Sequence, residues 1–574
     1  MDRRRFSICT LALAAVALLV LPALASARVA YFTGSAGGVG MLAAPVELST
    51  QTANPANQVT VSMASEGAPP DVAIAPDGKT AYVINSNFPT GVVPIDVATN
   101  KAKPSIPVDQ SPRSIAITPD GRFAYVASSF SSDFVSKIDL ATNAVVAKIP
   151  IGDNLFGIAV TPDSRTVYVV SSNDDAVFPI DVATNAVGAA IPVGPFPSAV
   201  AVTPDGTSAY VLVPSEEKLV QINLATNTVV GSIPNVPGVE LAIAPNSAKA
   251  YAVGFSEATP VDLVAGVAGA PITNANQDSF PDVAFLPDGS HAYMTTQHFE
   301  MSNFVGLMTP IATTSDTLEA AFPLNASFVE ALAIVPNQPP RAAFSSTPAP
   351  AKPQQAASFD ASASADTDGG SVARYEWNFG DGTVVTSGGA KPQHTYAKPG
   401  TYQVTLTTTD NEGCSVSIVF PGQTAYCNGS SIARVTHPVV VATNICPSVK
   451  AKASTFVPKR RPGKVLPGVR VRLSTGVPSR LTVTATLLYE LDGKPASAGL
   501  GEISVNVNKW RRVRFALPSE LRPMVPVGTP VKVAVRIESA PRNGAPCEAS
   551  VTNRNLKVHV VKVFPNRVQE LRVR

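Results

Sequence analysis

The sequence has little of what a helical, a membrane-spanning or a metal-dependent protein needs. Beyond the N-terminal segment, no long stretch has helical periodicity and no second apolar stretch is long enough to cross a bilayer. Charged residues make up only 15% of the chain, and no nucleophile elbow, metal-ligand pair or glycine-rich phosphate loop occurs. What is present is 52 Pro and 38 Gly among frequent Val, Thr and Ala, a composition typical of short strands joined by tight turns. The 574 residues leave room for three or four such domains.

The N-terminus has the pattern of an export signal. "MDRRRFS" supplies positive charge, "ICTLALAAVALLVLPAL" is a short apolar run, and "ASA" ends at Ala27 as a small-residue cleavage site. We therefore predict a signal peptide at 1–27 and a secreted, extracellular or cell-envelope protein without a transmembrane span in the mature chain. A membrane anchor is the alternative that the short run and its cleavage sequence disfavour. Arg3, Arg4 and Phe6 leave a twin-arginine route open.

The cysteines agree with export. Cys9 lies in the leader, and the mature chain keeps an even number of cysteines, which allows three pairings: Cys414, Cys427, Cys446 and Cys547. We favour one disulfide across the short loop 414–427 and one between Cys446 and Cys547, with stabilisation of about 3 and about 5 kcal/mol from loop closure. A zinc site is the rival interpretation, but neither the spacing nor a neighbouring His supports it.

A phrase such as "ITPDGRFAYVASS" recurs along the first half of the chain. Its tyrosines stand at 31, 82, 125, 168, 210, 251 and 293, so most repeats are 41 to 43 residues long. A period just above forty, with each unit divisible into four strand-like pieces, predicts a β-propeller. In "PDG" at 119–121, Pro presets φ, Asp bonds to its own backbone and Gly accepts a positive φ, while Thr142 and Asn143 form the outer turn.

Neither end of the repeat region holds a whole unit. The chain enters at "RVAYFTG", which matches a second strand, and the last piece, "EALAIVPN", matches only a first strand. We therefore predict a seven-bladed propeller over 28–338, with a closing blade built from 28–63 plus a strand at 329–336. Such closure removes exposed strand edges.

The repeat pattern, complete at Pro112–Gly152 and Pro197–Pro237, resembles the YVTN-type, lactonase-like β-propellers of microbial surface and secreted proteins. This resemblance implies the propeller fold and raises hydrolase activity as a possibility. The family's catalytic set does not match onto this chain residue by residue, and His291 and His298 have the spacing of ordinary surface residues. We predict no catalytic residue.

The second region contains, in order, "SFDASASADTDGG", "YEWNFGDGT" and "HTYAKPGTYQVTLTTTDNEG", and it resembles a PKD domain, an Ig-like β-sandwich, over 341–442. Trp377 and Phe379 alternate as inward residues, and Tyr402, Val404 and Leu406 face one side of a strand. After Gly413 the sequence departs from the family's usual ending with an insertion at 414–427. Calcium is the one cofactor considered, because Asp366 and Asp368 offer hard oxygen ligands, although an Asx turn explains the same letters.

Residues 443–574 show alternation typical of a further Ig-like sandwich, so the fold class is all-β throughout. Residues 28–338 carry 11 Lys and Arg against 27 Asp and Glu, and residues 443–574 carry 24 against 7. The basic domain could hold an anionic envelope polymer, the two ends could attract each other, or both could be surfaces tuned for solubility. Nucleic acid is not expected as a partner, because no aromatic residues interleave the basic ones.

These patterns predict a non-catalytic, exported binding or adhesion protein, with an extracellular protein or envelope polysaccharide as partner. A lactonase-like hydrolase and a structural spacer are the alternatives. The loops that follow the Tyr-bearing strands should gather at one end of the propeller as its interaction surface; the residues proposed there are Asn85, Ser86, Asn87, Phe88, Ser129, Phe130, Asn173, Asp174, Glu216 and Glu217.

Overall fold

The computed structural model describes residues 28–36, 40–63, 70–129, 133–273, 276, 278–300, 303–349 and 351–442, together with the backbone of eight strands between 450 and 573. The predicted signal peptide, Phe130 and the pair Cys446 and Cys547 lie outside these residues. Within them the regular structure is β-strand with three short 3-10 turns, η1 (Pro55–Asn57), η2 (Pro214–Glu216) and η3 (Ser431–Ala433). No helix of the described part is long and apolar enough to span a bilayer.

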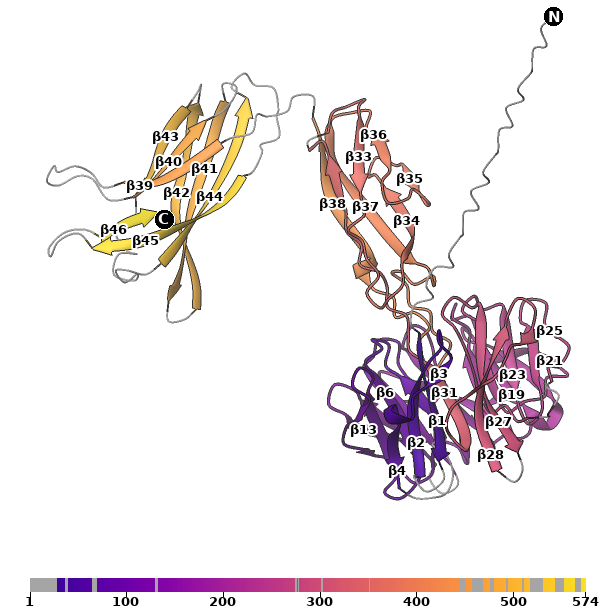
Figure 1. The fold of residues 1–574 in the computed structure, drawn as a ribbon. Coiled ribbons are helices and arrows are strands. Elements are labelled where there is room, and N and C mark those ends of the chain that lie inside the picture. The colour runs from indigo at the N-terminus through magenta and orange to yellow at the C-terminus, as the bar shows by residue number, and fades with distance from the viewer. Residues whose placement is uncertain are drawn as a thin grey trace, which may run out of the picture.

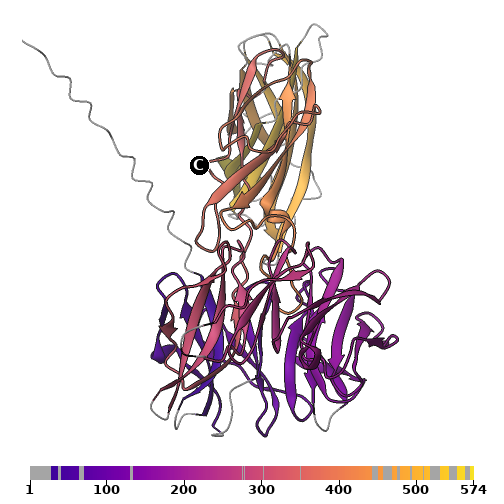
Figure 2. The same cartoon turned by 90° about the vertical axis from the view of Figure 1, so that its right-hand side faces the viewer.

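Seven antiparallel sheets form the propeller (Figures 1 and 2). The inner strands of six blades are β5 (Val72–Ile74), β10 (Pro112–Ile117), β14 (Leu155–Val160), β18 (Val200–Val202), β22 (Glu240–Ile243) and β26 (Val283–Phe285). Their second strands are β6 (Thr80–Asn85), β11 (Phe123–Ser128), β15 (Thr166–Ser171), β19 (Ser208–Val213), β23 (Lys249–Val253) and β27 (His291–Glu300). The third strands are β7 (Gly91–Asp96), β12 (Phe134–Asp139), β16 (Ala176–Asp181), β20 (Lys218–Asn223), β24 (Ala258–Asp262) and β28 (Asn303–Ala312). The outer strands are β8 (Lys101–Ala102) with β9 (Ile106–Pro107), β13 (Ala144–Pro150), β17 (Ile191–Pro192), β21 (Thr228–Pro234), β25 (Val267–Ala268), and β29 (Thr317–Leu318) with β30 (Phe322–Pro323).

The seventh blade joins the two ends of the ring. Its inner strand is β31 (Phe328–Ile334), which pairs antiparallel with β1 (Val29–Ala36) so that Ala30 faces Ile334 and Tyr31 faces Ala333. The remaining strands are β2 (Gly40–Glu47), β3 (Thr52–Ala53) and β4 (Val59–Ser62). The first described strand thus pairs with a strand about 300 residues later, as the incomplete repeats indicated.

The repeated letters make local turns and contacts between blades. Gly121 has φ +69°, and the Asp120 carboxylate accepts a hydrogen bond from the Arg122 amide, so "PDG" forms the expected turn. The "ATN" asparagines adopt the left-handed conformation, which Asn tolerates better than most residues. In this position Asn143 accepts a hydrogen bond from the Tyr82 hydroxyl of the preceding blade, and Asn227 accepts one from Tyr168 at 2.5 Å. The tyrosine and the asparagine of the repeat therefore link successive blades.

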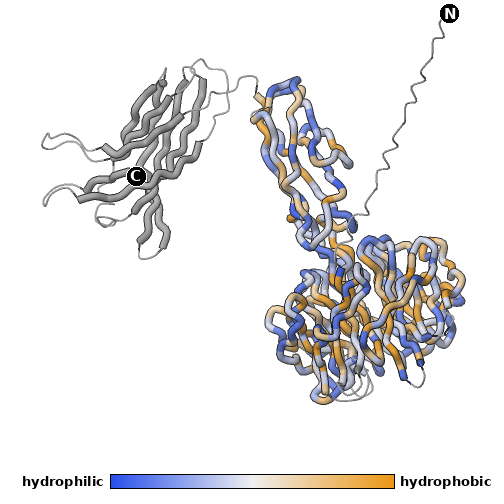
Figure 3. The backbone as a smooth tube through the Cα atoms, viewed as in Figure 1, coloured by the Kyte–Doolittle hydropathy of each residue, from blue (hydrophilic) through white to orange (hydrophobic). Residues whose placement is uncertain are grey.

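Apolar side chains between neighbouring sheets form the core of the ring. One cluster joins Tyr125 and Val135 of one blade to Ile158 and Val169 of the next. Figure 3 shows the strands of the blades as mainly hydrophobic and the turns as hydrophilic.

A sandwich follows the propeller, and we call it the middle sandwich. One sheet contains β32 (Ser345–Thr347), β33 (Ala356–Asp360) and β36 (Gln393–Thr395), and the other contains β35 (Val384–Val385), β34 (Val372–Asn378), β37 (Gly400–Asp410) and β38 (Arg434–Val441). Trp377, Phe379, Val404 and Leu406 are fully buried between the sheets, and Tyr402 packs against them, as predicted.

The C-terminal region forms two further antiparallel sheets. One contains β39 (Lys450–Phe456), β40 (Gly468–Ser474) and β43 (Trp510–Ala516); the other contains β42 (Lys494–Val507), β41 (Ser479–Leu491), β44 (Pro530–Pro541), β45 (Thr552–Lys562) and β46 (Gln569–Val573). The chain is therefore all-β from the propeller to the C-terminal sandwich.

Candidate functional site

The propeller has two faces, which we define by the loops that form them. The docked face carries the turns that follow the inner strands, such as 119–121 and 204–206. The open face carries the beginnings of the inner strands and the loops that follow the Tyr-bearing strands, such as 86–90 and 172–175. These two sets adjoin, because the amide of Ser129 bonds to Ser111 and that of Ser172 bonds to Asn154.

The inner strands of the blades surround the central channel of the ring. A segment of the middle sandwich covers the end of this channel at the docked face. We call Phe420–Tyr426, which belongs to the predicted insertion, the plug. The plug bonds to the ends of five inner strands: Val202 N to Pro421 O (3.0 Å), Val160 N to Gly422 O (2.7 Å), Ile117 N to Gln423 O (3.3 Å), Ile74 N to Thr424 Oγ1 (3.0 Å) and Tyr426 Oη to Ile243 O (2.6 Å). The docked face is thus fixed to the middle sandwich by hydrogen bonds that five separate blades provide.

Local sequence explains why the plug fits so closely. Gly422 has φ +127°, and a Cβ atom there would lie 2.8 Å from Cβ of Ala159, so a larger residue is excluded. Phe420 and Ala425 are buried against the apolar cluster of two blades, and the disulfide Cys414–Cys427 joins the two ends of the loop. The predicted pairing of Cys414 with Cys427 is therefore confirmed.

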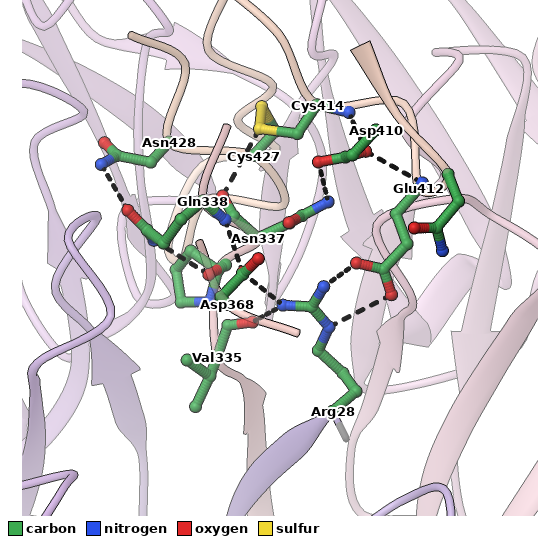
Figure 4. Close-up of polar contacts among 12 residues, drawn as sticks. Arg28, Val335, Asn337, Gln338, Asp368, Asp410, Glu412, Cys414, Cys427 and Asn428 are labelled. Atoms are coloured by element: carbon green, nitrogen blue, oxygen red, sulfur yellow. Dashed lines mark hydrogen bonds and ion pairs between the residues drawn. A yellow bond between two sulfur atoms is a disulfide. The ribbon is translucent and has the colours of Figure 1, made fainter. Parts of the chain in front are cut away.

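Arg28, the first residue that the structure describes, lies at the same junction (Figure 4). The Arg28 guanidinium pairs with the carboxylates of Asp368 and Glu412, and the Gln338 amide bonds to Asp368 at 2.8 Å. Nδ2 of Asn337 donates to Asp410 at 3.1 Å. These partly buried ion pairs fix the link between the propeller and the middle sandwich.

Three buried oxygens in this junction are the candidate ligands for the calcium predicted at Asp366 and Asp368. Oδ1 of Asn337, of Asp366 and of Asp368 is buried with no hydrogen-bond partner among the described residues. Burial and the neighbouring Asp368 raise the pKa of Asp366 to about 6. Hard oxygens without partners suit calcium, although Arg28 already supplies one positive charge to Asp368. Within the described part of the chain, no group of three or more His, Cys, Asp or Glu side chains is arranged for a metal, so the amide oxygen of Asn337 would have to take part.

A cavity of about 480 Å³ opens at the other end of the channel, on the open face. Four carboxyls line it, and they come from four consecutive blades in ring order: Glu240, Asp282, Glu330 and Asp71. The only basic residue in its lining is Arg113, whose guanidinium lies 4.2 Å from the centre of the Phe156 ring. Gln423 of the plug also lines the cavity, so the plug forms its floor.

Two of these carboxyls hold the inner strands together. Asp71 accepts hydrogen bonds from the Ile115 amide (2.8 Å) and the Ser114 hydroxyl (2.9 Å) of the next blade. Asp282 accepts one from the Leu332 amide at 2.7 Å. Burial raises the pKa of Asp71 to about 6, and burial with the neighbouring Asp71 raises that of Asp282 to about 8. Both side chains therefore have a structural use that accounts for their position.

The other two carboxyls have no such use. Among the described residues, the side chains of Glu240 and Glu330 accept no hydrogen bond and form no ion pair. Burial raises the pKa of Glu240 well above its usual range, and the Asp282 and Asp71 carboxyls add to this effect. Burial also raises the pKa of Glu330, while Arg113 lowers it. Glu240 faces the cavity from an enclosed position.

The predicted loop residues that the structure describes belong to the open face, but they differ in exposure. Phe88 is 91% exposed, and Ser86, Asn173, Asp174, Glu216 and Glu217 are also exposed. Asn85 and Ser129 are buried. Asn85 bonds to Pro89 of its own loop, and Ser129 bonds to Ser111 in the adjoining segment, so both belong to the scaffold rather than to the surface. Nothing in the lining of the cavity was on the predicted list.

Alignment of the repeats could have found part of the cavity. The position directly before the first core residue of each inner strand holds Asp71, Glu240 and Asp282 in three blades, and Ser114, Gly157 and Ala199 in three others. A carboxyl at this repeat position indicates an acidic centre of the ring, whereas the prediction of the interaction surface considered only the loops after the Tyr-bearing strands.

The family model for the PKD domain matches residues 337–420. The chain contains a PKD domain. The match ends where the plug begins, so the plug is an addition to the part of the PKD domain that the family model describes.

Two curated relatives match this chain over short stretches. The chain is 51% identical over 55 residues to collagenase ColA of Clostridium perfringens and 49% identical over 47 residues to collagenase ColA of Bacillus cereus. These matches cover 10% and 8% of this chain and 5% of each collagenase. The chain thus spans a small fraction of the relatives' length.

Solved structures with a similar shape share little sequence with this chain. Hydrazine synthase of Kuenenia stuttgartiensis is 23% identical with a TM-score of 0.34, covering 37% of this chain and 65% of that one. Dihydro-heme d1 dehydrogenase NirN is 14% identical with a TM-score of 0.41, covering 53% and 74%. A putative 6-phosphogluconolactonase of Bacteroides uniformis is 13% identical with a TM-score of 0.44, covering 54% and 100%. The propeller assignment rests on the seven sheets and not on these scores.

Proposed function

We propose that this chain is an exported, non-catalytic binding protein whose propeller contacts its partner through the open face. The observation that carries the proposal is the plug, which occupies the channel at the docked face and leaves the acidic cavity facing the open face. Recognition commonly resides on loops that a rigid scaffold holds. The exposed rings of Phe88 and Phe255 support a protein or an envelope polysaccharide as partner.

Export is the second part of the proposal. The disulfide Cys414–Cys427 supports it, because such bridges persist in oxidising compartments. So does the PKD domain, a module typical of extracellular proteins. The predicted signal peptide at 1–27 is consistent with both observations, and secretion or a position on the cell surface follows from it.

The PKD domain and the C-terminal sandwich would act as spacer and anchor. Residues 443–574 carry 24 Lys and Arg against 7 Asp and Glu, which supports contact with an anionic envelope polymer. Binding of the full chain to an immobilised polyanion should then weaken steadily as salt rises, because screening shortens the range of the attraction. Salt-independent retention contradicts this part of the proposal.

The main test compares the two faces in the full chain. Purified protein is screened by biolayer interferometry against envelope proteins and polysaccharides. The double variant Phe88→Ala/Phe255→Ala alters the open face, and Val230→Ala, 57% exposed on outer strand β21, serves as control. The proposal expects a hit that the first variant loses and the second retains. Equal loss in both variants, or no loss in either, contradicts it.

One observation favours a second candidate, a lactonase-like hydrolase. Asp282, with a pKa of about 8, would be a protonated carboxyl in a cavity that also contains Asp71, and such a pair can divide acid and base roles. Turnover of a panel of lactones, abolished by Asp282→Asn and unaffected by Asp133→Asn at an exposed site, would favour it. Absence of turnover across the panel leaves the binding function ahead.

A further inference from the structure

The exposed phenylalanines of the propeller lie on one face. Seven are at least 37% exposed, and all seven belong to the open face because they occur in loops after second strands, before inner strands, or at the adjoining strand ends; they are Phe88, Phe134, Phe196, Phe255, Phe299, Phe304 and Phe328. The described part of the docked face has none. A cluster of exposed aromatic rings on a folded protein is typical of an interaction site.

Five of these rings belong to the blades that supply the carboxyls: Phe88, Phe255, Phe299, Phe304 and Phe328. Phe304 stacks near Phe328, with ring centres 4.5 Å apart, and Phe299 contacts Phe304 at 5.1 Å. Phe328 and Glu330 are two residues apart on β31, whose pairing with β1 is irregular between Val329 and Leu332. Phe255, 81% exposed, lines the cavity itself. The aromatic surface is thus continuous with the acidic lining.

Two carboxyls, Glu240 and Glu330, line the cavity, and among the described residues neither side chain accepts a hydrogen bond or forms an ion pair. The single cation of the lining, Arg113, lies over the Phe156 ring and lowers the pKa of Glu240 and Glu330, so one positive charge faces four carboxyls. A metal ion does not suit this arrangement, because no three acidic, His or Cys side chains converge in the described part of the chain. An organic cation is larger and can reach carboxyls on different blades.

From this geometry we infer, building on the proposed function, that the open face binds a basic segment of a partner protein by admitting a Lys or Arg side chain to the cavity. The cation would lie among Glu240, Glu330 and the neighbouring carboxyls, where its hydrogen bonds to carboxylate would be stronger than bonds between neutral groups. The apolar stem of that side chain would pack against Phe255 and the Phe299, Phe304 and Phe328 cluster. The cavity volume of about 480 Å³ lies in the range that accommodates such a group.

The probe is a short fluorescent peptide in which lysine alternates with glycine, measured by anisotropy with the full chain. A second peptide carries arginine instead of lysine, a third carries norleucine, which keeps the stem and removes the charge, and free butylamine tests whether the cation alone is sufficient. The inference expects Lys or Arg peptides to bind at least about tenfold more tightly than the norleucine peptide, a factor typical of losing one paired charge. Equal affinities for lysine and norleucine overturn it, and binding of butylamine with the affinity of the peptide assigns the site to a free amine instead.

Matched variants separate the cavity from the overall negative charge of the propeller. Glu240→Gln removes a carboxyl that a bound cation would ionise, without removing a hydrogen bond made to a described residue. Asp77→Asn removes one charge at an exposed position on the docked face. We expect Glu240→Gln to weaken the Lys peptide about tenfold and Asp77→Asn to change it less than about twofold. Phe255→Ala, at an exposed ring, is the second variant and should also weaken binding without affecting the thermal midpoint. Equal effects of Glu240→Gln and Asp77→Asn overturn the inference.

The result also distinguishes this inference from the proposed function. If the open-face variant Phe88→Ala/Phe255→Ala loses an envelope partner while Glu240→Gln has no effect on any basic peptide, only the cation site is wrong. If neither variant alters any interaction, the open face is not a binding surface.

Discussion

The phenolic oxygen of Tyr426 donates a hydrogen bond of 2.6 Å to the main-chain oxygen of Ile243, which lies 183 residues earlier in the chain. The donor belongs to the plug and the acceptor ends an inner strand of the propeller. Tyr426→Phe removes this bond while keeping the ring, so we expect a loss of about 1 kcal/mol in the stability of the junction. The thermal midpoint of the full chain, followed by differential scanning calorimetry, measures the change.

The matched control for this substitution is Tyr402→Phe. The Tyr402 hydroxyl donates to the Lys398 carbonyl at an exposed position of the PKD domain. We expect Tyr402→Phe to leave the midpoint within the error of the experiment. A larger effect at Tyr402 than at Tyr426 contradicts the assignment of the plug as a structural contact.

Removal of the disulfide should release the plug. In Cys414→Ser/Cys427→Ser the loop of 13 residues loses its covalent closure, which is worth about 3 kcal/mol in the chain-entropy estimate. We expect faster chymotrypsin cleavage after Tyr426, read by mass spectrometry under native conditions. The variant Cys446→Ser/Cys547→Ser is the comparison and should leave the cleavage after Tyr426 unchanged.

The propeller should lose stability as pH rises. Asp71 and Asp282 have native pKa values of about 6 and about 8, above the ordinary value of 3.8 that applies in the unfolded chain. The native state therefore binds more protons than the unfolded state between pH 4 and these values, and the unfolding free energy falls over that interval, by at most about 1.4 kcal/mol per pH unit for each carboxyl. Denaturant unfolding at several pH values measures the slope.

Asp282→Asn isolates one of these groups. Above pH 6, where Asp71 has already ionised, the variant should show a flatter pH dependence than the native sequence. Asp133→Asn, at an exposed position, should keep the original slope. A slope that is unchanged in Asp282→Asn shows that this carboxyl is not the group that titrates.

Calcium should stabilise the junction between the propeller and the PKD domain. Oδ1 of Asn337, Asp366 and Asp368 is unpartnered there, and an ion that binds only the folded state raises its stability. We expect millimolar calcium to raise the thermal midpoint of the native sequence, and Asp366→Asn to reduce the increase. Magnesium is the comparison, because it demands a stricter octahedral geometry. No change with calcium contradicts the proposed site.

The ring could be predicted from sequence because its determinants are local. Each "PDG" and "ATN" turn is specified by residues within one repeat. The Tyr of one repeat and the Asn of the next, such as Tyr168 and Asn227, also recur at a nearly fixed spacing. The disulfide Cys414–Cys427 could also be predicted from the sequence, because it closes a short loop.

The plug and the acidic cavity could not be predicted in the same way. Gly422 and Tyr426 contact strands that lie some 180 to 260 residues earlier, and no periodicity links such positions. The sequence showed only that the PKD pattern is interrupted after Gly413. Glu240 and Asp282 come together because each begins an inner strand of a closed ring, a relationship that appears once the repeats are aligned in space.

The pairing of β1 with β31 also sets an order of events during synthesis. A chain is made from its N-terminus at a finite rate, so Tyr31 is available long before its partner Ala333 has been translated. Until then β1 has an unpaired edge, and the six complete blades have no closure. Tyr426 follows later still, so the channel can be sealed only after the ring has its final strand. A nascent chain interrupted before residue 328 would expose two strand edges at once, which makes this interval the point at which a chaperone would be most needed.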